Sequence, residues 1–105
     1  MSVVIVGGND RMHCQYKAIC KQYGCRCKVF TQMSSQLKCQ IGSPDLMILF
    51  TNTVSHKMVE CALSEARRND TLVERSHSSS ATALKGIMEK LVGERHGELQ
   101  SSVAN

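Results

Sequence analysis

Two strand-like segments of the chain are unbroken apolar runs, and two others mix apolar with polar residues. Segments 3–6 and 46–50 contain only apolar residues, which is typical of strands buried on both faces of a parallel sheet. Segments 25–31 and 71–75 contain a smaller share of apolar residues, and they predict two further strands. Because Arg26 and Lys28 interrupt segment 25–31, we expect that strand to lie at an edge of the sheet.

Between these segments the larger apolar residues recur at helical spacing. In residues 10–23 they stand at Met12, Tyr16, Ile19 and Tyr23, which line one face of a helix that ends before Gly24. Stretches 55–68 and 79–92 show the same spacing and predict two more helices, and 34–43 predicts a short helical turn. Residues 93–105 have no sustained apolar stripe, so we expect a frayed or disordered C-terminal tail.

Strands that alternate with helices at this spacing predict a parallel sheet, because each connection must return across a face before the next strand starts. The sequence therefore predicts an α/β protein. Its expected architecture is a small three-layer Rossmann-like domain over residues 1–92, with four parallel strands in the order 2-1-3-4 and helices on both faces. The chain of 105 residues has the usual size of one such domain.

The carboxyl ends of the strands are the expected ligand site, because open parallel sheets bind ligands where successive connections leave in opposite directions. Loops 7–11, 51–56 and 76–80 meet there and lead into helix N-termini, which favour anions. We expect a small anionic or nucleotide-like ligand. The candidate residues are Gly7, Gly8, Asn9, Asp10, Arg11, Asn52, Ser55, His56, His77, Ser78 and Ser79.

Simpler roles are available to the same residues. The two glycines could serve only a tight turn, since neither the third glycine nor the acidic residue of a dinucleotide-binding fingerprint is present. Asp10, Ser55 and one of Ser78, Ser79 and Ser80 could cap helices. Neither role excludes a ligand at neighbouring amides.

The two loop histidines suggest an alternative, a metal- or haem-binding redox or sensor protein. His56 and His77 follow adjacent strands and could hold a metal or haem iron, together with His13 or Cys14. A zinc site is a further alternative, although no Cys-x-x-Cys motif occurs; its four thiols would be Cys20, Cys25, Cys27 and Cys39. The sequence leaves open whether the protein is an enzyme.

Composition and charge narrow the range of partners. Hydrophobic residues make up 42% of the chain and charged residues 21%, as in ordinary globular domains. The net charge of +4 is mild and there are only four Phe and Tyr residues and no Trp, which argues against nucleic acid. No apolar stretch is long enough for a membrane span, and the first residues do not resemble a signal peptide. We therefore expect a cytoplasmic protein with reduced cysteines, and a homodimer formed through helix faces or an edge strand is left open.

Several segments together resemble a bacterial family. They are Val4-Ile5-Val6-Gly7-Gly8, Asp10-Arg11-Met12, Tyr16, Tyr23-Gly24, residues 51–58 and residues 75–80. Over about residues 2–91 the chain is similar to the small proteins grouped as domain of unknown function family 2325. The resemblance implies a cytosolic bacterial protein with a Rossmann-like domain, and it implies no activity. Asn9 stands where similar proteins are expected to carry histidine.

Overall fold

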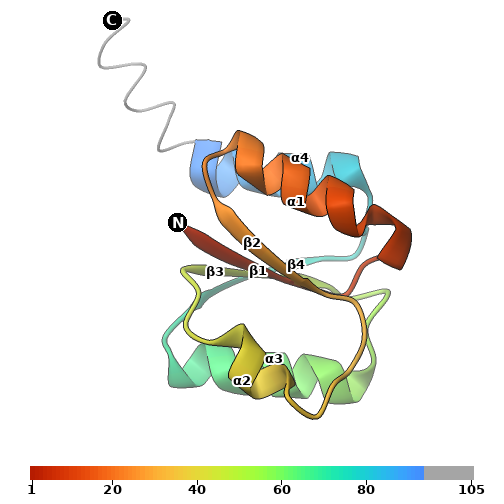
Figure 1. Ribbon diagram of the computed structural model, residues 1–105, viewed down its shortest axis with the longest axis vertical. Helices are drawn as coiled ribbons and strands as arrows, with labels where there is room; N and C mark the ends of the chain where they lie inside the picture. Colours follow the sequence, from red (N-terminus) through yellow and green to blue (C-terminus); the bar gives the residue numbers. More distant parts are fainter. Residues whose placement is uncertain (94–105) are drawn as a thin grey trace, which may run out of the picture.

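A single four-stranded sheet forms the middle layer of the protein (Figure 1). The computed structural model describes residues 1–93. All strand pairs are parallel and the order is β2-β1-β3-β4, which confirms the predicted fold class. The strands are β1 (Ser2–Val6), β2 (Arg26–Phe30), β3 (Leu46–Phe50) and β4 (Leu72–Ser76).

Helices cover both faces of the sheet, as the sequence predicted (Figure 1). Helices α1 (His13–Gln22) and α4 (Ala81–Met88) pack together on one face. On the other face lie α2 (Leu37–Ile41) and α3 (His56–Arg68). None of the helices in the described part of the chain is long and apolar enough to cross a membrane.

The first and last helices differ from their predicted forms. The stretch 10–23 begins with a 3₁₀ turn, η1 (Asp10–Met12), because the Asn9 side chain accepts a hydrogen bond from the amide of Arg11. After α4 the chain widens into a π-helical turn, η2 (Glu89–Gly93), which brings Val92 into the core. Gly93 thus belongs to a helical turn, and the rest of the predicted tail, 94–105, lies outside the described residues.

The central strands are buried on both sides, which explains their unbroken apolar sequences. Along β1, Val3 and Ile5 face α1 and α4, whereas Val4 and Val6 face α2 and α3. Every side chain of β3 is likewise buried. The edge strand β2 keeps Arg26 and Lys28 exposed, as expected for a strand with one open side. The sheet is therefore a rigid base from which three βα loops project at its carboxyl edge.

Candidate functional site

The loops after β1 and β3 are joined directly by a hydrogen bond. The amide of Gly8 donates to Thr53 Oγ1 over 2.7 Å, and the same hydroxyl donates to the carbonyl of Phe50 over 3.1 Å. The loop after β1 is thereby held against the end of β3. This contact lies at the carboxyl edge of the sheet, where the sequence predicted the ligand site.

The loop after β4 is joined to both of the others. The Tyr16 hydroxyl accepts a hydrogen bond from the amide of Asn9 (3.3 Å) and donates one to the carbonyl of Ser79 (2.5 Å). The amide of Thr51 donates to the carbonyl of Ser76 over 2.8 Å. Residues 7–9, 51–55 and 76–80 are thus tied to one another, and we refer to these three segments as the loop ring.

Tyr16 organises the loop ring although it belongs to a helix. Its side chain is fully buried, and its ring centroid lies 5.3 Å from that of Phe50. Sequence analysis placed Tyr16 on the apolar face of a helix, which is correct, but it missed the role of the hydroxyl group. The role of Thr53 was missed as well. A tyrosine or a threonine in the sequence does not indicate which backbone group its hydroxyl will contact.

Replacing Tyr16 with phenylalanine is expected to lower the free energy of unfolding by about 1–3 kcal/mol. The change removes only the hydroxyl, and it leaves the Asn9 amide and the Ser79 carbonyl without their partner. Chemical denaturation followed by circular dichroism would measure the effect. Replacing Tyr23, whose hydroxyl bonds to Glu89 at the surface, with phenylalanine is the matched control and should have a smaller effect. An equal loss of stability in the two variants would contradict the proposed role of Tyr16.

The two glycines of the loop ring are required by backbone conformation and by space. Gly7 and Gly8 have φ angles of 98° and 93°, which residues with a side chain rarely adopt. A Cβ atom on Gly7 would lie 2.4 Å from Val54 Cγ1, and one on Gly8 would lie 2.7 Å from the Tyr16 ring. The Gly7 amide donates to the carbonyl of Phe30 over 2.8 Å. The amides of Gly7, Gly8 and Asn9 therefore all have partners within the protein.

Three polar side chains cap the helices that begin at this edge. Asn9 caps η1, Ser55 caps α3 through the amide of Met58, and Ser80 caps α4 through the amide of Ala83. The prediction that Asp10 is a cap is wrong. Its carboxylate instead accepts hydrogen bonds from Thr31 and Gln32 in the segment after β2, because Asn9 already occupies the capping position.

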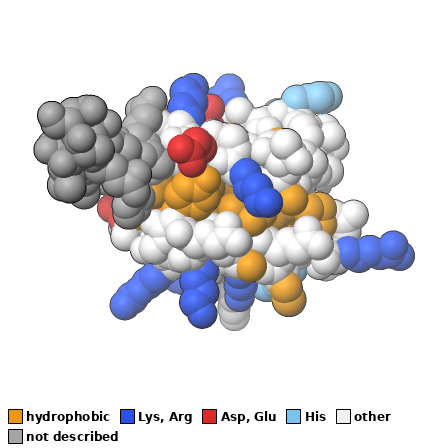
Figure 2. All heavy atoms as spheres, turned by 90° about the horizontal axis from the view of Figure 1, so that it is seen from above, with side chains coloured by type: hydrophobic (Ala, Val, Ile, Leu, Met, Phe, Trp, Pro, Cys, Tyr) orange, Lys and Arg blue, Asp and Glu red, His pale blue; other side chains and the backbone are white. Residues whose placement is uncertain are grey.

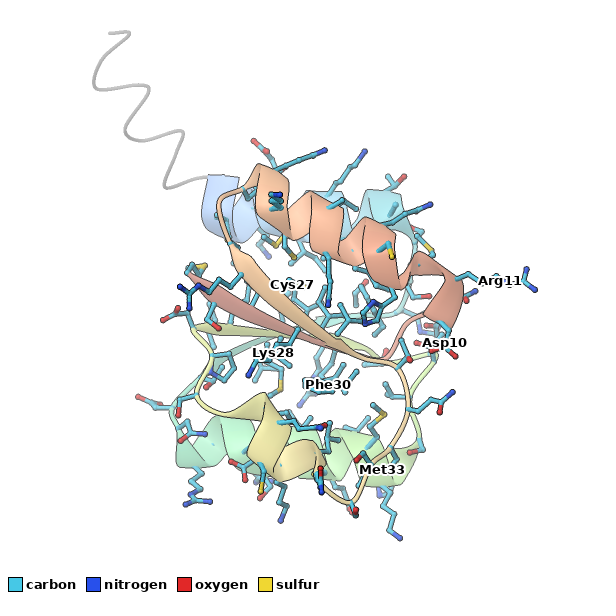
Figure 3. The ribbon with its side chains drawn as sticks, in the orientation of Figure 1. Asp10, Arg11, Cys27, Lys28, Phe30 and Met33 are labelled. Carbon is cyan, nitrogen blue, oxygen red and sulfur yellow. The ribbon has the colours of Figure 1, made fainter. Side chains whose placement is uncertain are left out.

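Exposed basic and imidazole side chains surround the loop ring. Arg11 on η1 projects away from the body of the molecule (Figure 3). His56 and Lys57 start α3, and His77 follows β4; all three are exposed. In Figure 2 basic side chains are spread over the face in view; at the right-hand end they occur together with a histidine side chain, and the acidic side chains in view lie nearer the middle and the left.

The remaining candidate residues are also accessible. Asn52 and Ser78 are exposed and Ser79 is half-buried, while the Ser78 hydroxyl lies 3.2 Å from that of Ser80. His56 has an 88% exposed side chain, and its Nε2 lies 3.0 Å from Glu60 Oε1. The first turns of α3 and α4 contain no acidic residue. The amides of Met58 and Ala83 bond to the capping serines, and the other amides of those first turns have no acidic residue of the same turn beside them.

The metal alternatives gain no support from the arrangement of side chains. In residues 1–93 no group of three or more His, Cys, Asp or Glu side chains is placed to hold a metal ion. The four-cysteine zinc site is wrong, because Cys39 lies on α2, on the opposite face of the sheet from Cys20, Cys25 and Cys27. Metal or haem binding through His56 and His77 stays a prediction.

An open hollow of about 420 Å³ lies beside the edge strand β4. It is lined by parts of α3, the following turn and β4, including Arg67, Asp70 and Arg75. No residue of the loop ring contributes to it. The candidate site at the loop ring is consequently a polar surface rather than part of this hollow.

These features define a class of protein: a small parallel α/β domain whose three βα loops form one polar edge. The chain belongs to the family described as uncharacterized protein conserved in bacteria (DUF2325), whose model matches residues 2–91. This match confirms the resemblance found in the sequence. Neither the curated proteins nor the solved structures include a match to this chain.

Proposed function

We propose that this protein binds a small anionic or nucleotide-like ligand on the exposed side of the loop ring. The observation that carries the proposal is the joining of the three loops by hydrogen bonds, because it holds the N-termini of α3 and α4 at one edge. A ligand there would meet a surface whose geometry exists before binding. Preorganised groups lose less conformational entropy when a ligand binds.

The groups that would contact the ligand are not those of the glycine turn. Since the amides of Gly7, Gly8 and Asn9 have internal partners, the turn supports the site rather than cradling a phosphate. The proposed contacts come from the first turns of α3 and α4 and from exposed or half-buried side chains. Those side chains are Arg11, Asn52, His56, His77, Ser78 and Ser79.

Charge supports an anion over a cation at this edge. Arg11 and Lys57 have cationic side chains, and the imidazoles of His56 and His77 carry N–H donors. The Asp10 carboxylate is engaged by Thr31 and Gln32. The Glu60 carboxylate is engaged by His56. The arrangement suits binding rather than a particular reaction, and we assign no catalytic residue.

Replacing His56 and His77 together with alanine is expected to abolish ligand binding and to change the free energy of unfolding by less than about 1 kcal/mol. Both side chains are exposed, so their removal disturbs little packing. Thermal melts with inorganic phosphate, adenosine monophosphate and adenosine diphosphate would reveal binding as a rise in melting temperature of the parent protein. The double variant should show no such rise.

A matched control removes two exposed basic side chains from the opposite edge of the sheet. Lys21 and Arg26 lie near the amino ends of the strands, and their double alanine variant should bind as the parent does. If none of the three probes raises the melting temperature of the parent, the proposal is wrong for this ligand class. If the His56 and His77 variant still binds, the ligand lies elsewhere. If that variant fails to fold, the histidines have a structural role.

A further inference from the structure

Three of the six cysteines gather where α1 ends and β2 begins. Cys20 is completely buried in the last turns of α1, Cys25 is buried, and Cys27 is half-buried on β2. The amide of Cys25 donates to the carbonyl of Cys20 over 3.0 Å, which folds the start of β2 back onto the end of α1. Cys27 follows two residues later and therefore faces the same side of the strand as Cys25.

The thiols of Cys20 and Cys27 are near neighbours. Cys27 packs against the core cluster that contains Cys20, and each thiol shifts the pKa of the other. In Figure 3 Cys27 lies on β2 below α1, whereas Lys28, its neighbour on the strand, is labelled nearer the α2 and α3 layer. The Cys25 sulfur contacts the carbonyl of Tyr23 at 3.6 Å.

The surroundings make the two thiols chemically different. Interaction with the Cys20 thiol lowers the pKa of the Cys27 thiol against the opposing effect of burial, and the ammonium group of Lys17 lowers it further. The same interaction and burial raise the pKa of the Cys20 thiol. Cys27 is also the more exposed of the two, so exposure and charge both favour Cys27 as the nucleophilic thiolate of the pair.

We propose that Cys27 and Cys20 form an oxidation-sensitive pair that reacts with a hydroperoxide to give an intramolecular disulfide. The Cys27 thiolate attacks one peroxide oxygen and the O–O bond breaks. The departing hydroxide takes a proton from solvent and leaves as water, and Cys27 becomes a sulfenic acid. The Cys20 sulfur then attacks the Cys27 sulfur. The S–O bond breaks, and the released hydroxide leaves as water with the Cys20 proton.

In total the two thiols lose two electrons and the peroxide is reduced to two water molecules or, with an organic peroxide, to water and an alcohol. The product links the end of α1 covalently to the edge strand β2. The position of each partner matches its role, since the half-buried Cys27 is reached first and the buried Cys20 is protected until the sulfenic acid forms beside it. A thiol placed next to a low-pKa cysteine is the arrangement expected of a resolving residue.

The test uses the whole chain in its reduced form, in which all six cysteines are free thiols. The protein is treated with a small excess of hydrogen peroxide, the remaining thiols are blocked with N-ethylmaleimide, and the peptides are mapped without reduction. We expect one disulfide, between Cys20 and Cys27, that forms before Cys14 or Cys39 is modified. Dithiothreitol should restore both thiols.

Variants separate the two roles. Cys27→Ser should form no disulfide, and Cys20→Ala should stop at a sulfenic acid on Cys27 that dimedone traps. Lys17→Ala should slow the oxidation of Cys27, whereas Lys21→Ala on the same helix is the matched control and should not. Cys20→Ala alters a buried position, so the variant could lose its fold. The peptide map of the parent protein does not depend on that variant and tests the proposal independently.

Several results would overturn the proposal. One is a parent protein whose exposed Cys14 or Cys39 is oxidised while Cys20 and Cys27 both stay reduced. Another is a disulfide that joins Cys25 to either partner. Equal rates of oxidation in the parent and in Lys17→Ala would show that the charge beside Cys27 does not activate it.

Discussion

Replacing Gly8 with alanine is expected to lower the free energy of unfolding by about 2–5 kcal/mol, from the strained backbone and the overpacked side chain together. The φ angle of 93° disfavours any residue with a Cβ atom. The added methyl would lie 2.7–3.0 Å from atoms of the Tyr16 ring. That ring is buried against Phe50 and tied to Ser79, so it has little freedom to move aside. Urea denaturation followed by circular dichroism would measure the loss.

The matched control is Gly86→Ala in the middle of α4. Apart from the adjacent residues and the nearby backbone of α4 itself, no atom lies within 4 Å of the position that its Cβ would take, and the backbone there is helical. Alanine should therefore raise the free energy of unfolding by roughly 0.5–1 kcal/mol through helix propensity alone. A Gly8→Ala protein as stable as its parent would show that the loop after β1 can rearrange, which would remove the basis for a rigid loop ring.

Replacing Phe50 with alanine is expected to lower the free energy of unfolding by about 3–5 kcal/mol, the usual range for a buried aromatic residue. Phe50 is completely buried at the end of β3 and its ring packs against Tyr16. The substitution leaves a cavity beneath the loop ring. It also removes the support of the tyrosine whose hydroxyl joins Asn9 and Ser79. The protein should consequently lose both global stability and local order in the loops.

Chemical denaturation reports the first effect, and hydrogen exchange at the amides of Gly8 and Asn9 reports the second. Leu72→Ala provides the control, because this residue of β4 is 56% exposed and its truncation should change stability by only about 0.5 kcal/mol. Unchanged exchange at Gly8 and Asn9 in a destabilised Phe50→Ala protein would show that the loop ring does not depend on the core beneath it.

The fold was largely predictable because each strand and helix carries a local pattern. The apolar runs 3–6 and 46–50 required burial on both faces, and only a sheet between two helical layers provides that. The charged residues Arg26 and Lys28 marked β2 as an edge. The predicted order 2-1-3-4 is the order observed in the sheet. The edge that carries the candidate site could also be predicted, because the carboxyl ends of parallel strands all lie at the same edge of a sheet.

Details that depend on contacts between distant residues could not be predicted. Asn9 rather than Asp10 caps η1, and the Asp10 carboxylate reaches Thr31 and Gln32 after β2. The amides of the glycine turn looked free in the sequence. Folding brings them to Phe30, Thr53 and Tyr16, at separations in the sequence that no local pattern records.

The chemistry of individual side chains is likewise divided between what the sequence determines and what the tertiary structure decides. The sequence by itself determined that His56 and His77 follow adjacent strands and that six cysteines are present. Only the tertiary structure decided that Cys39 lies across the sheet from the other candidate zinc ligands and that Cys27 packs against the core cluster containing Cys20. The physical reason is that periodicity specifies which face a side chain occupies, whereas packing between α1 and β2 decides which side chains on that face come within bonding distance.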